Sequence, residues 1–67
     1  MRIDRVKLIA EMARQDMKAI RLAEITGITK ATITSIRSGK ACYDDTGHRI
    51  AAALGVDINT LIETREV

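Results

Sequence analysis

The chain has 67 residues, enough for one small domain with a single core; 30% of them are charged and 46% are apolar. Its apolar runs are too short to cross a membrane, its first ten residues lack the apolar core of a signal peptide, and its single cysteine excludes a disulfide framework or a zinc knuckle. We therefore predict one all-α domain over residues 1–67, packed from Leu, Ile, Met and Ala, in a reducing cytoplasm and without membrane contact.

The net charge of +2 is unevenly distributed along the chain. Residues 1–40 carry nine Lys and Arg against four Asp and Glu, a net charge of +5. Residues 41–67 carry two basic groups against five acidic ones, a net charge of −3. A basic half indicates a polyanionic partner. A merely solvated helical surface is the alternative that charge alone leaves open.

Apolar periodicity, capping residues and glycines predict five short helices, over residues 4–15, 19–26, 29–38, 45–54 and 58–64. The first helix has an apolar stripe at helical spacing, made by Leu8, Ile9, Met12 and Ala13. In the second helix Leu22 and Ala23 face inward. The last two helices begin at aspartate N-caps, which are Asp44 or Asp45 for the fourth and Asp57 for the fifth.

The segment from Gly27 to Gly39 differs most from an ordinary surface helix. Gly27 permits a turn with positive φ, and the Thr29 hydroxyl can cap the helix that follows. Ile33 and Ile36, three residues apart, anchor that helix to the core. The rest of its surface carries short hydroxyls, one methyl group and a few cations, where Glu and Lys are usual. This spacing is that of a helix-turn-helix.

The stretch LAEITGITKATITSIRSGK, followed by HRIAAALGVDINTLIE, resembles the phage repressor and Cro-like family of helix-turn-helix proteins, often called XRE-type. The resemblance covers about residues 6–63 and rests on several short pieces taken together, namely Leu22-Ala23, Gly27-Ile28-Thr29, Ile33, Ile36, Gly39-Lys40, Ile50-Ala51 and 53–56. It implies a compact five-helix, lambda-repressor-like DNA-binding domain in which the second and third helices form the helix-turn-helix.

The resemblance also implies that the third helix reads base edges in the major groove, through Lys30, Ala31, Thr32 and Ser35. The chemistry of these residues agrees with that role. Lys30 can donate to guanine, the methyl groups of Ala31 and Thr32 can contact a thymine methyl, and hydroxyls can donate or accept at several bases. Short side chains also let the helix enter the groove deeply.

A second set of residues is expected to contact phosphate and so to position the domain, namely Lys18, Ala19, Thr29, Arg37, Ser38, Lys40 and Tyr43. At the start of the second helix the contact would come partly from backbone N–H groups and the positive helix end. For Tyr43 the alternative is that its ring packs over the junction of the third and fourth helices.

The sequence departs from the family pattern at several positions. Ala19 replaces a Gln that usually bonds phosphate and the recognition helix. Arg37 replaces a frequent Glu, and Met12 replaces its partner Arg, so the usual internal ion pair cannot form. We predict that Met12 is ordinary core and that Arg37 turns toward solvent or phosphate. Asp44 and Asp45 make the following loop acidic.

The function predicted from these residues is a sequence-specific, repressor-like transcriptional regulator that binds double-stranded DNA. Relatives bind as homodimers on two-fold symmetric sites, and their last helix carries the dimer contact, which places self-association here at residues 58–67. The alternative is a protein-interaction module, such as a small antitoxin or a mobile-element accessory factor. An exposed patch including Ile20 and Ile25 would support it, although both could instead be filler over the first helix.

No enzymatic or metal chemistry is predicted. The chain has no nucleophile paired with a base, no phosphate loop and no metal-ligand cluster, and we expect no cofactor. Cys42 is interpreted as an ordinary loop thiol and His48 as a solvated surface residue, while Asp44 and Asp45 are interpreted as helix N-terminal charges.

Overall fold

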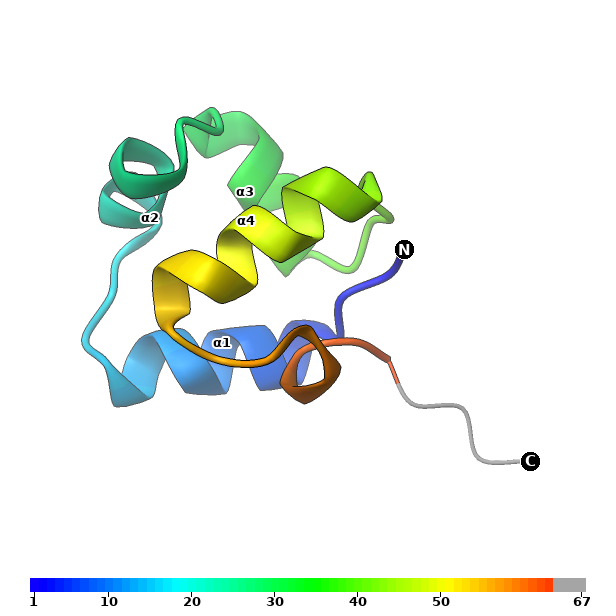
Figure 1. The fold of residues 1–67 in the computed structure, drawn as a ribbon. Helices are drawn as coiled ribbons and strands as arrows, with labels where there is room; N and C mark the ends of the chain where they lie inside the picture. The colour runs from blue at the N-terminus through cyan, green and yellow to red at the C-terminus, as the bar shows by residue number, and fades with distance from the viewer. Residues whose placement is uncertain (64–67) are drawn as a thin grey trace.

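The structure is a computed structural model that describes residues 1–63. Its elements are four α-helices and one turn of 3-10 helix, namely α1 (Arg5–Arg14), α2 (Ala19–Thr26), α3 (Lys30–Arg37), α4 (Asp44–Leu54) and η1 (Ile58–Thr60). Figure 1 shows α1 along one side of the molecule, α2 and α3 on the other, and α4 running between them. The described residues form no strand apart from one isolated bridge, and the all-α prediction is confirmed.

Most predicted helix ends are explained by local capping. The Asp4 carboxylate accepts hydrogen bonds from the backbone N–H groups of Val6 and Lys7, at 2.9 and 3.2 Å, and so begins α1. Helix α4 ends at a glycine in the left-handed region, Gly55, with a φ of 70°. The predicted aspartate cap of α4 is wrong. Tyr43 occupies its N-cap without a side-chain bond, and the two aspartates lie in the first turn, where their charge suits the helix dipole.

The core is formed by one cluster of buried aliphatic residues from all the helices, namely Ile3, Leu8, Met12, Ala19, Leu22, Ile33, Ile36, Ile50, Ala51, Leu54 and Leu61. Met12 is only 3% exposed, which confirms that it is ordinary core. The predicted stripe on α1 is half right, because Leu8 and Met12 are buried whereas Ile9 and Ala13 are exposed. Helix α1 therefore carries apolar residues on two sides.

The predicted fifth helix, residues 58–64, is wrong in extent. Asp57 caps it as expected, accepting from the Asn59 N–H at 2.8 Å, but helical structure ends at Thr60 after one 3-10 turn. The reason is a long-range pairing, because Ile62 forms an antiparallel bridge with Ile3. Residue 64 lies outside the described residues.

The first residues of the chain run beside the last described ones. The Asp4 N–H donates to the Leu61 carbonyl at 2.8 Å, and the Glu63 N–H donates to the Arg2 carbonyl at 3.0 Å. Ile3 and Leu61 are both fully buried between these bonds. Leu61 is therefore used within the protomer, and the predicted dimer contact at residues 58–67 loses its main apolar residue, while 64–67 lie outside the described part.

The described part of the chain has no helix both long and apolar enough to cross a bilayer. Within residues 1–63, no group of three or more His, Cys, Asp and Glu side chains is placed to hold a metal ion.

Candidate nucleic-acid interface

Helices α2 and α3 are joined by a tight turn at Gly27. Gly27 adopts a φ of 75°, and its N–H donates to the Ala23 carbonyl at 2.9 Å, closing the end of α2. The Thr26 hydroxyl donates to the Leu22 carbonyl at 2.7 Å and accepts from the Ile28 N–H at 3.2 Å. These local hydrogen bonds hold the turn and so help to fix the angle between the two helices.

Helix α3 is held by one side and leaves the other open. Ile33 and Ile36 are 0% and 1% exposed, so they seat the helix in the core. At about 100° per residue, the opposite side is centred on Ala31 and Ser35, with the predicted reading residues around it. Lys30, Ala31 and Thr32 are exposed, and Ser35 is partly so. Lys30 and Thr32 point about 160° apart, one on each side of Ala31, so the four predicted base-reading residues are spread over the whole surface of α3 that faces away from the seam.

One further residue of this side, Thr34, was missed by the sequence prediction. It is exposed and points between Lys30 and Ala31 on the helical projection. Helical spacing alone could have identified it, because it lies farther from the Ile33 and Ile36 seam than Thr32 does.

Two threonine hydroxyls at the start of α3 are linked. The Thr29 oxygen accepts from the Thr32 N–H at 3.2 Å, which confirms the predicted N-cap, and its hydroxyl donates to the Thr32 oxygen at 2.9 Å. This arrangement leaves the Thr32 hydroxyl proton available to an outside acceptor. The Thr29 proton is already engaged, so Thr29 would have to exchange partners to bind a phosphate.

The opposite end of α3 borders a shallow hollow on the surface, lined by Thr32, Ser35, Ile36, Lys40, Ala41, Cys42, Tyr43 and Thr46. Lys40 is exposed at its edge. Tyr43 is 85% exposed, so its ring does not pack over the junction between α3 and α4. The Ser38 hydroxyl, a predicted phosphate contact, already donates to the Ser35 carbonyl at 2.6 Å.

Arg37 is neither fully exposed nor fully buried. Its side chain is half-buried, and its Nε is buried without a hydrogen-bond partner. The expectation that it turns fully outward is therefore only partly met. Because its buried stem packs at the side of α3, the guanidinium is kept close to the helix while retaining donors for an outside acceptor.

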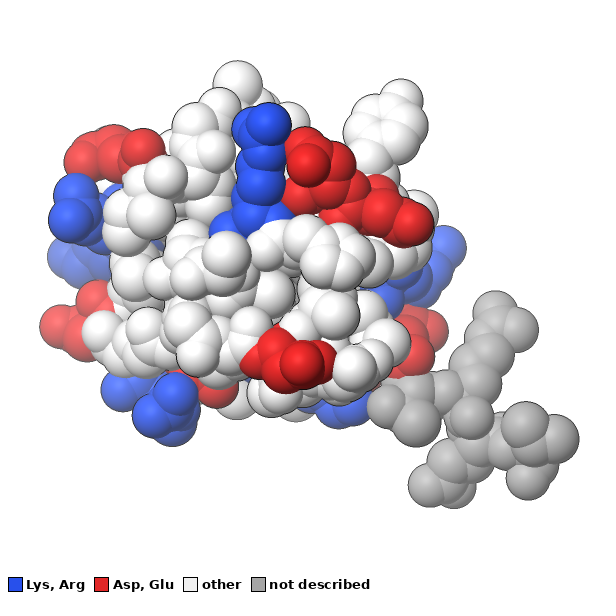
Figure 2. All heavy atoms as spheres, viewed as in Figure 1, with Lys and Arg blue, Asp and Glu red and all other residues white. Residues whose placement is uncertain are grey.

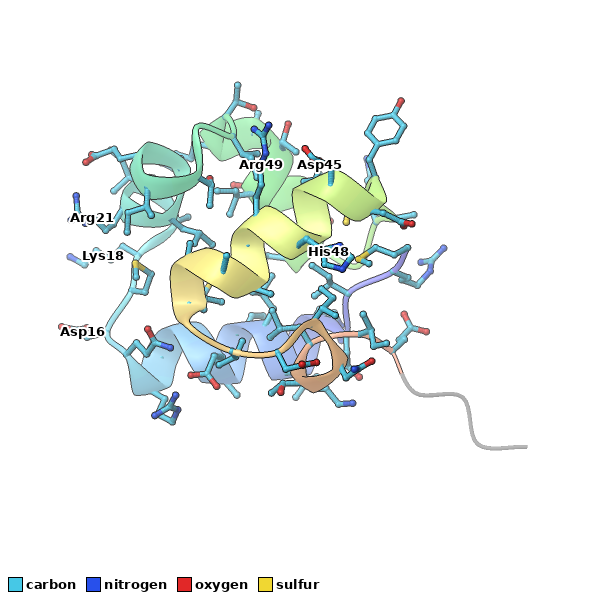
Figure 3. The ribbon with its side chains drawn as sticks, viewed as in Figure 1. Asp16, Lys18, Arg21, Asp45, His48 and Arg49 are labelled. Carbon is cyan, nitrogen blue, oxygen red and sulfur yellow. The ribbon has the colours of Figure 1, made fainter. Side chains whose placement is uncertain are left out.

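The start of α2 contains the remaining two predicted phosphate contacts. Lys18 is exposed at the N-cap and makes no side-chain capping bond, so the first N–H groups of α2 have no side-chain acceptor. The Ala19 methyl group is 8% exposed and belongs to the core, which leaves only its backbone for an outside contact. Figure 3 shows Lys18 and Arg21 extending outward at this edge.

The carboxylates nearest this surface are matched by cations. Asp45 accepts from Arg49 at 3.0 Å, and Asp44 lies 3.4 Å from the Met1 amine. Figure 2 shows basic and acidic side chains adjoining over α4, where Figure 3 places Arg49 and Asp45 together. Within residues 18–40 there are five Lys and Arg but only one carboxylate, Glu24, which pairs with Arg21 at 3.5 Å. The α2–α3 segment therefore keeps its positive charge.

Neither Cys42 nor His48 is arranged for catalysis. Burial raises the pKa of the Cys42 thiol above its ordinary value, so it stays protonated and weakly nucleophilic near neutral pH. His48 is exposed, and its Nδ1 lies 2.7 Å from the backbone carbonyl of Asp44. These two residues support no chemistry at the hollow.

The α2–α3 segment therefore combines three features. It has a tight turn, a helix with an open polar side, and more cations than carboxylates. A sequence profile of the Cro/C1-type HTH DNA-binding domain matches residues 7–66. The chain belongs to this Cro/C1-type family. Comparisons with curated proteins and with solved structures find no significant match. The Cro/C1-type match confirms the resemblance inferred from the sequence, and its span includes the whole helix-turn-helix.

The ion pair that is usual in the family between the first and third helices is absent from the described residues, as the sequence predicts. Met12 is buried in the core, and Arg37 has no carboxylate partner among the described residues. Helix α3 is thus fixed by burial alone at this point, which leaves one more cation for outside contacts.

Proposed function

We propose that the chain is a sequence-specific regulator of transcription that binds double-stranded DNA and acts as a repressor by occupying its site. The proposal rests chiefly on the open side of α3, where every exposed group is short or cationic and none is a carboxylate. A carboxylate there would repel the phosphates that line the groove. The family supports DNA as the partner.

In this proposal α3 enters the major groove with its N-terminal half deepest. Lys30 donates to guanine O6 and N7, and the Ala31 methyl contacts a thymine methyl. The Thr32 hydroxyl, already accepting from Thr29, donates its proton to a base acceptor. Thr34 and Ser35 contact the next base edges along the groove.

Phosphate contacts hold the domain over the groove on both sides. The uncapped N–H groups and Lys18 at the start of α2 bind one strand, and Lys40 and the exposed Tyr43 hydroxyl bind the other. Arg37 adds a charge between them. Thr29 and Ser38 contribute after their hydroxyls exchange internal partners for phosphate oxygens.

Two copies bind together on a two-fold symmetric site. One domain of this size covers roughly 600–1,000 Å² of its own surface on DNA, which is small for tight and specific binding. Two copies on half-sites about 34 Å apart double that contact.

The experiment is selection of bound sites from a random duplex pool, followed by titration of the selected site over a salt series. We expect a short palindromic site and an affinity that falls steeply with salt. Lys30→Ala should relax the preference at one base position, whereas Lys40→Ala should weaken all duplexes alike and lower the salt slope by about one. Failure to bind any duplex at low salt would refute the proposal.

A further inference from the structure

Helix α1 has a second apolar side that the core does not use. Val6, Ile9, Ala10 and Ala13 recur at i, i+3, i+4 and i+7, and all four are exposed. Val6 is 66% exposed and Ile9 40%. We call these four residues the α1 stripe. No other described helix exposes such a row, because Ile20 and Ile25 of α2 point about 140° apart.

The α1 stripe is bordered by cations on both sides. At about 100° per residue, Arg5 falls beside Ile9 on one side, and Lys7 and Arg14 fall beside Ala10 on the other. Arg5 makes no ion pair among the described residues. The only carboxylate within α1, Glu11, is turned inward, where it accepts from Arg14 and Gln15.

The two acids near the N-terminal end of the stripe are also engaged. Asp4 caps α1, and Glu63 lies 3.8 Å from the Arg2 side chain. Together with Arg5, Val6, Ser38 and Gly39 they line a shallow hollow, so this end of the stripe adjoins the C-terminal end of α3. Arg14 is paired with Glu11, and the Lys7 ammonium donates to the Ile62 carbonyl at 3.3 Å, so the positive charge of the border comes chiefly from Arg5 on one side and Lys7 on the other.

This combination selects one kind of occupant. Two alanines in the stripe let another helix approach closely, with its ridges between Val6 and Ile9. Cations on both borders complement carboxylates on that helix and oppose a second copy of α1, since cations would face cations. An anionic membrane is a poorer fit, because interfacial helices present large Trp, Phe or Leu side chains.

We propose that the α1 stripe is a docking surface for an acidic amphipathic helix of a partner protein. The surface shares no residue with the open side of α3, and Figure 1 shows α1 on the side of the molecule away from the α2–α3 turn. A partner held mainly by Ile9, Ala10 and Ala13, which lie outside the hollow shared with Ser38, can therefore bind while α3 is on DNA. Ile20 and Ile25 are 55% and 45% exposed, so they are not filler over α1.

The test uses the isotope-labelled full chain and two stapled helical peptides of about four turns each. Both peptides carry the same Leu and Ala stripe, with Glu on its borders in one and Lys in the other. We expect the Glu peptide to shift the amide resonances of the α1 stripe in a saturable way. Val6→Glu, at the most exposed position, should weaken that binding about ten-fold or more.

Ala13→Glu, at the other end of the stripe, gives an independent second variant, and Ile20→Glu on α2 is the matched control that should leave peptide binding unchanged. Circular dichroism reports whether each variant is folded. Equal binding of the Lys peptide, or no shifts with either peptide, would overturn the proposal. So would shifts centred on α3, where the peptide would be mimicking DNA.

Two further measurements separate the other occupants. Shifts of the α1 stripe on concentrating the protein alone would assign the stripe to a second copy. Sedimentation with phosphatidylserine vesicles, abolished by Val6→Glu, would assign it to a membrane. Either result would replace the protein partner. Duplex binding by Ala13→Glu reports separately on the proposed function, because Ala13 lies toward the other end of α1 from the hollow that Val6 shares with Ser38 and Gly39.

Discussion

Helices α1 and α3 both leave one side open, and the two sides differ in chemistry. The open side of α3 is polar, with hydroxyls, one methyl group and cations. That of α1 is apolar, with cations only at its borders. Both helices are held by the same means, two fully or nearly fully buried aliphatic residues. The core therefore places no demand on what either helix presents outward.

The difference teaches that positive charge alone does not identify a nucleic-acid surface. Arg5, Lys7 and Arg14 on α1 are as numerous as the cations around α3. The two helices differ in the side chains that lie between their cations. On α3 these are hydroxyls and a methyl group, which match base edges, whereas on α1 they are a row of Val, Ile and Ala, which does not. Single substitutions on each helix test this distinction.

The largest expected effect comes from the buried seam that positions α3. Ile33→Ala removes a fully buried side chain and should lower the free energy of unfolding by about 2–5 kcal/mol. Val6→Ala, at a position 66% exposed on α1, should change it by less than about 0.5 kcal/mol. Denaturant titration measures both. Equal losses would mean that the two positions are equally packed.

The comparison is most direct with the same substitution on both helices. Ala31→Glu places a carboxylate on the open side of α3 and should lower duplex affinity about 100-fold or more, with little change in stability. Ala10→Glu places one in the α1 stripe and should leave duplex affinity within about two-fold. Fluorescence anisotropy at fixed salt measures both. A comparable loss for Ala10→Glu would make α1 part of the DNA surface.

Arg37 tests the replacement of the expected ion pair. Arg37→Ala should weaken duplex binding about three- to ten-fold and reduce the salt slope by about one. Its melting temperature should change little, since Met12 supplies the packing at that point. A large drop in melting temperature with unchanged affinity would show that Arg37 is structural.

The N-cap of α3 should have a moderate effect on stability. Thr29→Ala removes the acceptor of the Thr32 N–H and should cost about 1 kcal/mol of unfolding free energy. Thr29→Ser keeps the hydroxyl and should recover most of the loss. If Thr29→Ser is as unstable as Thr29→Ala, the methyl group and not the cap is responsible.

The smallest effect is expected on the inward side of α1. Hydrogen bonds, chiefly from Gln15 and to a smaller extent from Arg14, hold the pKa of the Glu11 carboxyl below its ordinary value of 4.5. The ionised form therefore stabilises the fold above that value, and the contribution is lost as the pH falls through the lower folded-state pKa. Glu11→Gln should be slightly less stable than the parent at pH 7, and the difference should shrink at pH 3. A difference independent of pH would exclude this linkage.

Local signals accounted for the helix-turn-helix. Gly27, the Thr29 cap and the spacing of Ile33 and Ile36 all act within a few residues of one another, so the sequence alone predicts their geometry. The predicted reading residues all lie outside the buried seam of Ile33 and Ile36, and their contacts with DNA stay a prediction. Thr34 was missed because the family pattern, and not the helical projection, guided the choice.

Errors arose where distant segments decide the structure. Ile58, Leu61 and Ile62 have helical spacing, yet Ile62 pairs with Ile3, which is 59 positions earlier in the chain. Periodicity also assigned Ile9 to the core, because an apolar residue next to Leu8 cannot be sorted to one side without knowing which neighbours pack there. The exposure of Tyr43 likewise depends on the surrounding fold and not on its own identity.

The pairing of the chain ends bears on when the protein becomes complete during synthesis. Ile3 is covered by Leu61 and its neighbours, which the ribosome adds about an entire domain later. Until residues 61–63 have left the ribosome, Ile3 and the neighbouring part of the core are exposed to water. The nascent chain then carries α2 and α3 on an incomplete core. A chain that stops before Leu61 would leave Ile3 without this cover and should be a better substrate for proteases than the folded domain.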